Sequence, residues 1–175
     1  MNAVMALAKF DTTDVSVLLH NEAPDLWNHS IPGACELAKN AAAAAWVAAG
    51  RTGLVELSVV LGDDALSRRL NREFRGKDKP TNVLSFAMGN EAATGLPKLA
   101  GDVVIALETL INEAKSQHKT PEEHLGHLVV HGVLHLAGFD HREDSAASEM
   151  EQLEIAVLES LGIRDPYCDG GIAGK

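Results

Sequence analysis

The sequence is poor in several features that would otherwise define its class. It contains two cysteines, Cys35 and Cys168, which have no close spacing with each other or with the histidines. We therefore expect reduced thiols in a cytoplasmic protein, with a disulfide as the less favoured alternative. No apolar run approaches the roughly 20 residues of a membrane span. Residues 1–14 also lack the basic start and long apolar core of a secretory signal, so we expect no membrane partner.

An excess of basic residues is also lacking. The formal net charge is −10, which for the chain as a whole argues against a nucleic-acid partner. The basic residues are nevertheless concentrated between Ser67 and Pro80, where only two acidic residues accompany them. This basic segment contains Arg68, Arg69, Arg72, Arg75, Lys77 and Lys79. A local basic patch on an acidic protein predicts an anionic substrate.

The length of 175 residues favours a single domain with a substantial core. We expect this domain to span residues 14–167, with residues 1–13 and 168–175 as tails. Apolar and β-branched runs predict four strands, and helical periodicity with capping signals predicts five helices. The expected strands are 15–20, 54–61, 83–88 and 102–107, and the expected helices are 34–49, 65–74, 108–117, 120–137 and 145–161.

The order of these elements predicts an α+β fold, in which about five helices pack around a small mixed four-stranded sheet. The segment 21–32 contains two prolines and is expected to be a loop or short turn. The segment 89–100 contains glycine and proline and is expected to connect two strands as a long hairpin connection or mobile loop.

Three histidines near residue 135 have the spacing of a metal site. His131 and His135 are four residues apart, so a helix places both on one face. Gly138 can end that helix in a left-handed conformation and return His141 to the same point. Three imidazoles leave a fourth position open, as in a catalytic zinc site. Two further residues, His127 and Asp140, could orient a ligand histidine through a hydrogen bond, although His127 could simply neighbour the site and Asp140 could simply cap the turn.

The pattern H-x-x-x-H-x-x-G-x-x-H is also the spacing of metzincin proteases. Those enzymes carry a glutamate directly after the first histidine as the general base of peptide hydrolysis. Position 132 is glycine here. The spacing therefore predicts a zincin-like metal helix without the usual peptidase mechanism.

The basic segment continues into a loop whose residues predict phosphate binding. Arginine offers a planar fork of donors matched to phosphate oxygens and stays charged at any working pH. Arg75 falls at the end of the expected helix, before the Gly/Pro loop that carries Lys77 and Lys79. A surface salt bridge is the preferred interpretation for Arg68 and Arg69, but it explains Arg75 less well.

At these motifs the sequence resembles the YbeY family of bacterial endoribonucleases and ribosomal RNA maturation factors. The resemblance rests on FRGKDKPTNVLSF, GDVVI, HLVVHGVLHLAGFDH and DPY, and it is strong from about Asp63 to Tyr167. It implies a zincin-like α+β fold and one zinc ion held by His131, His135 and His141. It also implies that Arg75 is the functional arginine.

The resemblance further implies a single-strand-specific endoribonuclease that matures the 3′ end of 16S rRNA and takes part in ribosome quality control. The partners would be single-stranded RNA and the small ribosomal subunit with its proteins, in the cytoplasm. We expect metal-assisted phosphodiester hydrolysis in which His131 and Arg75 are catalytic, Arg75, Lys77 and Lys79 hold the RNA, and Asp140 is a weak candidate for the base. Two alternatives stay open, a metallopeptidase with a base from elsewhere and a non-catalytic ribosome assembly factor with a structural metal.

Overall fold

The computed structural model describes residues 11–89, 95–140 and 144–168. Its centre is a four-stranded sheet in the order β1 (Val15–Asn21), β2 (Val55–Gly62), β4 (Lys98–Ala106), β3 (Val83–Ala87). The first three are parallel to one another, and β3 runs antiparallel to β4 at one edge. The expectation of a small mixed four-stranded sheet is therefore confirmed.

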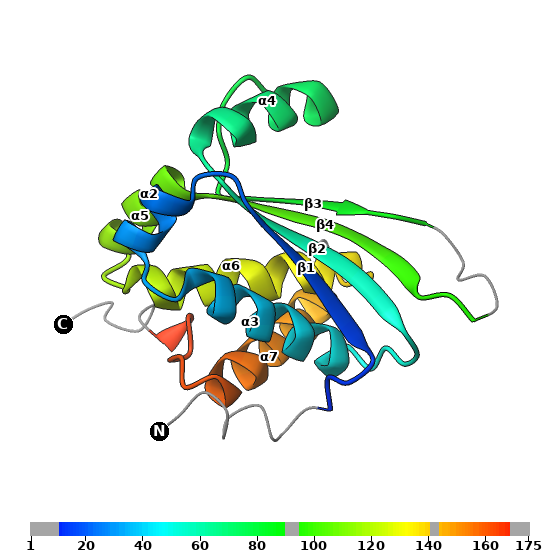
Figure 1. The fold of residues 1–175 in the computed structure, drawn as a ribbon. Coiled ribbons are helices and arrows are strands. Elements are labelled where there is room, and N and C mark those ends of the chain that lie inside the picture. Colours follow the sequence, from blue (N-terminus) through cyan, green and yellow to red (C-terminus); the bar gives the residue numbers. More distant parts are fainter. Residues whose placement is uncertain (1–10, 90–94, 141–143, 169–175) are drawn as a thin grey trace.

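Helices cover the two faces of this sheet unequally. Figure 1 shows α3 (Ala34–Ala48), α6 (Pro121–Leu136) and α7 (Asp144–Ser160) stacked against one face. On the opposite face, α4 (Asp64–Arg75) stands as an arm over one end of the sheet. No other helix of the described residues covers that second face, and α5 (Leu107–Ser116) follows β4 directly.

The core lies between the sheet and its helical layer. Alanines of α3 are fully buried, which lets this helix pack closely on α6 and on β1. Helix α6 begins at a complete capping box, in which the Thr120 hydroxyl and the Glu123 carboxylate each accept from the other's backbone N–H. This cap fixes where α6 starts and thus which of its residues face the sheet.

The prediction for residues 21–32 was wrong, because α2 (Pro24–Ser30) lies there. Pro24 occupies the first turn of α2, where the missing N–H costs no helical hydrogen bond. Trp27 anchors the helix, since its side chain is fully buried and its indole N–H donates to the Gly62 carbonyl. The helix thus depends on a contact with a distant strand, which a local pattern does not reveal.

The start of β4 was also predicted too late. The strand begins at Lys98, four residues before the expected position, and Lys98 and Leu99 pair with the beginning of β2. The connection from β3 to β4 is a hairpin, as one alternative proposed, and its residues 90–94 lie outside the described part of the chain. Among the described helices, none combines the length and apolarity needed to cross a membrane.

Candidate metal centre and active site

Two histidines of α6 face each other at its C-terminal end. The Nε2 atoms of His131 and His135 lie 3.0 Å apart. Gly138 follows with φ of 97°, a left-handed conformation that ends the helix as expected. The turn places the Phe139 carbonyl 2.9 Å from His135 Nδ1, which donates to it. His141, the third expected ligand, lies outside the described residues.

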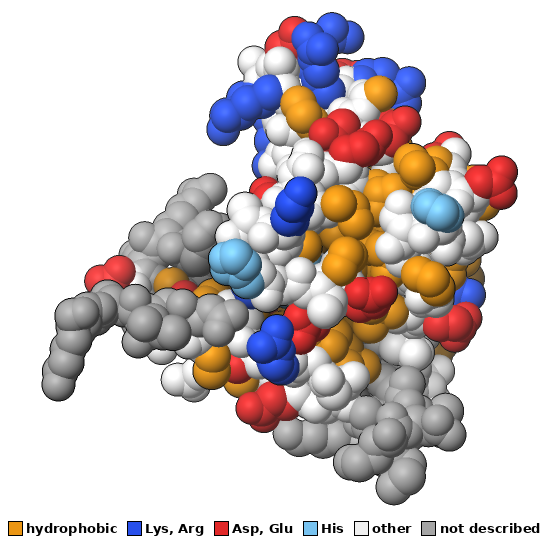
Figure 2. All heavy atoms as spheres, turned by 90° about the vertical axis from the view of Figure 1, so that its left-hand side faces the viewer, with side chains coloured by type: hydrophobic (Ala, Val, Ile, Leu, Met, Phe, Trp, Pro, Cys, Tyr) orange, Lys and Arg blue, Asp and Glu red, His pale blue; other side chains and the backbone are white. Residues whose placement is uncertain are grey.

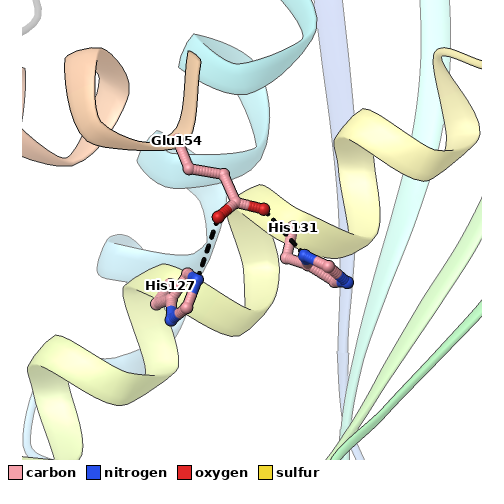
Figure 3. Close-up of side chains that lie close together, drawn as sticks. All are labelled: His127, His131 and Glu154. Atoms are coloured by element: carbon pink, nitrogen blue, oxygen red, sulfur yellow. Dashed lines mark hydrogen bonds and ion pairs between the residues drawn. The ribbon is translucent and has the colours of Figure 1, made fainter. Parts of the chain in front are cut away.

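A buried carboxylate from α7 holds the other histidine. Figure 3 shows Glu154 pointing from α7 toward α6, between His127 and His131. His131 Nδ1 lies 2.7 Å from one carboxylate oxygen, and His127 Nε2 lies 3.0 Å from the other. The Tyr167 hydroxyl donates to the second oxygen as well. Glu154 is 1% exposed, so the protein supplies nearly all of its surroundings.

These donors keep Glu154 ionised. Burial alone would raise the pKa of the carboxyl group, but the hydrogen bonds from His127, His131 and Tyr167 outweigh it and lower the pKa to about 2. Burial and the neighbouring carboxylate raise the pKa of the Tyr167 phenol, so it remains a donor. An ionised carboxylate only accepts hydrogen bonds, and His131 must therefore carry its proton on Nδ1.

The two Nε2 atoms consequently face each other. His135 also carries a proton on Nδ1, because a backbone carbonyl can only accept. The neutral forms of both rings could turn an Nε2 lone pair toward one metal ion, because the two Nε2 atoms lie 3.0 Å apart. This arrangement fits a metal ion, since neutral imidazole is the form of histidine that coordinates zinc.

A second group of potential metal ligands overlaps the first. His127, His131 and Glu154 offer ligand atoms that all lie within 4.8 Å of one another. Their mutual hydrogen bonds already occupy the atoms that would have to turn to a metal. His127 packs edge-on against the Tyr167 ring, with ring centroids 5.6 Å apart. The two groups share His131 and differ in which of its nitrogens would bind.

A cavity of about 640 Å³ opens beside the histidine pair, and we call it the site cavity. His131 and His135 line it together with Asp140 and Phe139, whereas His127 and Glu154 are not among its lining residues. Another part of the lining comes from the end of α4 and from β3 with the residue before it. It consists of Arg75, Asn82, Val83 and Ser85. Four residues named from the sequence (Arg75, His131, His135 and Asp140) therefore meet in one cavity.

Helix α4 delivers Arg75 to this cavity. The helix starts at an Asp63 cap, whose carboxylate accepts from the Leu66 N–H, and it ends at Gly76 in a left-handed conformation with φ of 69°. Arg75 is thus the last helical residue and projects from the arm. Figure 2 shows Lys and Arg side chains gathered at the top of the molecule, where Figure 1 places α4.

The other basic residues of the segment differ in their surroundings. Arg68 makes a two-pronged salt bridge with Asp78, at 2.9 Å for each contact, and Arg72 lies 3.9 Å from the same carboxylate. Within the described part of the chain, no ion pair involves Arg75, Lys77 or Lys79. Lys77 and Lys79 are exposed but are not among the residues that line the site cavity.

Gly132 lets α6 approach the sheet. A Cβ atom at this position would lie 2.6 Å from Val103 Cγ1 and 3.1 Å from Ser85 Oγ. The Ser85 hydroxyl donates to the Gly132 carbonyl at 3.0 Å, which ties α6 to β3. A side chain at residue 132 requires Val103 or the helix itself to shift. The protease glutamate is therefore absent from this chain and would also be poorly accommodated.

A second buried histidine supports the wall of the cavity from behind. His124 Nε2 lies 2.8 Å from Glu113, and the same carboxylate oxygen accepts from the Asn82 amide at 2.9 Å. Burial lowers the pKa of His124, so its neutral form is favoured. The Asn82 side chain also accepts from the Val83 N–H. This chain of contacts fixes β3 where it enters the cavity.

Sequence reasoning missed Glu154 and the role of Tyr167. The signal for Glu154 was present, because a lone acid occupies the buried stripe of α7 with Met150, Val157 and Leu158. A carboxylate in such a stripe requires a partner. The contact of Tyr167 with Glu154 joins segments that only the tertiary fold brings together.

Several known proteins resemble this chain in sequence. A family model described as Endoribonuclease YbeY matches residues 28–162. A protein of Paramagnetospirillum magneticum named Endoribonuclease YbeY is 58% identical over 119 residues, which cover 66% of this chain and 73% of that protein. The protein of the same name from Azorhizobium caulinodans is 48% identical, with 88% and 96% covered.

Solved structures include a relative as well. The solution structure of a Thermotoga maritima protein is 27% identical and superposes with a TM-score of 0.51, with 84% of this chain and 88% of that chain covered. The family model spans more than half of the chain and includes α6, α7 and the arm. The chain belongs to the YbeY family.

Proposed function

We propose that this protein is a zinc-dependent endoribonuclease that cuts single-stranded RNA. The observation that carries the proposal is the site cavity, which Arg75 lines together with the histidine pair of α6. Relatives from two bacteria bear the name Endoribonuclease YbeY. The basic arm supplies the charge that an RNA backbone requires.

His131 and His135 would hold the metal through Nε2, with His141 as third ligand. The 3.0 Å separation of the two Nε2 atoms and the position of both rings on the cavity wall favour this set over His127, His131 and Glu154. Glu154 and the Phe139 carbonyl would then act as the outer acceptors that fix the two imidazoles. A zinc ion held by these residues would supply Lewis-acid chemistry for the hydrolysis of a phosphodiester.

The other residues of the cavity bind and orient the substrate. The Arg75 guanidinium would donate to phosphate oxygens and stabilise the negative charge that grows in the transition state. Lys77 and Lys79, on the exposed loop after α4, would contact neighbouring phosphates. Asp140 is the one carboxylate among the described lining residues, and it is our candidate to accept a proton from the attacking water.

In the cell, the substrate would be ribosomal RNA. We infer a role in 16S rRNA 3′-end maturation and ribosome quality control, in contact with the small ribosomal subunit and its proteins in the cytoplasm. A peptidase is disfavoured because residue 132 has no room for a base. A purely structural metal is disfavoured because the histidine pair borders a cavity of about 640 Å³.

The proposal is tested by incubating purified protein with single-stranded RNA, with and without a chelator. We expect cleavage that the chelator and His131→Ala abolish and that Arg75→Ala reduces at least about a hundredfold. Metal content should be unchanged in Arg75→Ala. The matched control is Arg69→Ala, which removes an exposed arginine of the same helix that does not line the cavity. Cleavage at the wild-type rate by Arg75→Ala would contradict the assigned role.

A further inference from the structure

A second hollow lies on the other side of β3 from the site cavity. It has a volume of about 580 Å³, and residues of β1, β2 and β4 form its floor on the face of the sheet that carries α4. We call it the sheet hollow. Its aromatic wall consists of Phe74 from α4 and Phe86 from β3, and Met88 and Leu70 extend it.

Two pairs of neighbours in sequence connect the hollow to the site cavity. On α4, Phe74 lines the sheet hollow and the next residue, Arg75, lines the site cavity. On β3, Ser85 lines the site cavity and the next residue, Phe86, lines the sheet hollow, because successive residues of a strand point to opposite faces. The two spaces therefore meet across a single edge strand and the end of one helix.

The aromatic wall of the hollow is accessible to solvent, unlike an aromatic pair in the protein core. Phe74 is 61% exposed, and its ring meets Phe86 edge-on with centroids 5.1 Å apart. Met88 is 45% exposed beside it. An exposed phenylalanine next to two arginines, Arg72 and Arg75, combines a stacking surface with cations. That combination is how proteins hold single-stranded nucleic acid.

The charges in the hollow determine which part of a nucleotide it accepts. The Asp102 carboxylate lines the hollow and accepts from the Ser58 hydroxyl. A carboxylate repels phosphate but can accept from the amino group of a base. The arginines belong to the α4 rim, and the lining of the hollow is mostly apolar, with Asp102, Ser58 and His20 as its polar residues. A base therefore fits inside while its phosphates remain on the rim.

We propose that the sheet hollow binds an unpaired nucleobase of the substrate, stacked on Phe74 with Phe86 beside it, next to the nucleotide whose phosphate contacts Arg75. This inference rests on the proposed endoribonuclease function and deepens it. It also gives a physical cause for single-strand specificity, because a base that crosses the edge of β3 cannot remain stacked and paired in a duplex. A duplex would contact the arm through its phosphates alone.

The test measures binding of a short single-stranded RNA that carries 2-aminopurine, with the full-length protein and a chelator to prevent cleavage. Stacking on Phe74 should quench the probe. Phe74→Leu keeps an apolar side chain but removes the π face, and it should weaken binding about tenfold and abolish the quench, whereas Phe74→Tyr should keep both. The loss should be the same at low and high salt, because stacking releases no counterions. Leu54→Ala is the control, since Leu54 is 55% exposed and precedes β2 at the end away from α4.

A second oligonucleotide separates stacking from a general loss of fold. With an abasic residue in place of 2-aminopurine, wild type and Phe74→Leu should bind equally, and both should bind duplex RNA equally. Equal binding of the intact strand by wild type and Phe74→Leu, without a difference in quenching, would overturn the inference. The hollow would then be a candidate binding site for a protein partner instead. If the wild-type protein neither binds nor cleaves RNA, the proposed endoribonuclease function is wrong. The proposed nucleobase site is then wrong as well, because it rests on that function.

Discussion

His131 and His135 face each other with their Nε2 atoms 3.0 Å apart, and each ring donates its Nδ1 proton to a fixed acceptor on its other side. The carboxylate of Glu154 and the carbonyl of Phe139 thereby select the tautomer of both rings. The two Nε2 atoms are thereby directed toward each other. This orientation distinguishes the pair from other neighbouring histidines of α6, such as His124 and His127.

Removal of single histidines should identify the metal ligands. His135→Ala should lose bound zinc, because it deletes one of the two facing nitrogens. His127→Ala should retain zinc with weaker affinity, because it removes only a donor to Glu154. Zinc content after dialysis, measured by atomic absorption, checks both variants. Retention of zinc by His135→Ala and its loss from His127→Ala would instead support the group of His127, His131 and Glu154.

Glu154→Gln should weaken zinc binding by about 10- to 100-fold, the usual cost of losing an outer carboxylate partner. The amide preserves the shape of the side chain but gives His131 a neutral acceptor, so the basicity of its Nε2 falls. A competitive chelator titration measures the affinity. Histidine ¹⁵N chemical shifts of the metal-free protein report the tautomer of His131 independently. Glu151→Gln, an exposed substitution on the same helix, should change neither quantity.

Binding of single-stranded RNA should depend on salt through the loop after α4. Each phosphate contact on a single strand contributes about 0.7 to the slope of log affinity against log salt. Lys77→Ala and Lys79→Ala should each lower that slope by about this amount. Fluorescence anisotropy at several salt concentrations measures the slope. Arg68→Ala should have a smaller effect on the slope, because its guanidinium is already paired with Asp78. An unchanged slope in both lysine variants would show that neither lysine contacts the RNA backbone.

Acid should weaken the start of α6 through Glu123. Its hydrogen bond from Arg164, together with the Thr120 N–H, lowers the pKa of Glu123 to about 2 from an ordinary value near 4.5. The carboxylate therefore contributes stability that is fully present above about pH 4.5 and is lost as the pH falls toward about 2. Glu123→Gln keeps the capping hydrogen bonds but removes the charge. Its melting temperature should fall less than that of wild type over this window, whereas Glu122→Gln should follow wild type.

Gly132→Ala should destabilise the fold. The added methyl group meets Val103, a fully buried and stiff side chain, and overpacking of this kind costs about 1–3 kcal/mol. Alanine recovers about 1 kcal/mol through its helix propensity, so we expect a net loss of about 1–2 kcal/mol in urea unfolding. Gly126→Ala on the same helix is the matched control, because its methyl group would come too close only to Ile163 Cδ1, the far end of a flexible side chain, and would make an ordinary contact with Leu158. Equal stabilities of the two variants would show that α6 can move away from the sheet.

The parts of the fold that were predictable are those with local causes. The spacing of His131 and His135, the stop at Gly138 and the cap at Thr120 are encoded within a few residues of one helix, and the strands follow from apolar runs. The parts that were not predictable depend on contacts between distant segments. Trp27 stabilises α2 through the carbonyl of Gly62, and Tyr167 reaches Glu154 only after the chain has turned back past α7. No local sequence pattern predicts contacts between residues so far apart in the chain.

The close approach of α6 to the sheet at Gly132 also bears on how this scaffold can evolve. A glutamate introduced there would collide with β4 before it could act on any substrate, and the displaced helix would carry both metal histidines with it. A substitution of Gly132 by glutamate alone is therefore not expected to produce a peptidase. A smaller residue would first be needed at positions such as 103. This one glycine therefore separates RNA hydrolysis from peptide hydrolysis in proteins that share the same spacing of metal-binding histidines.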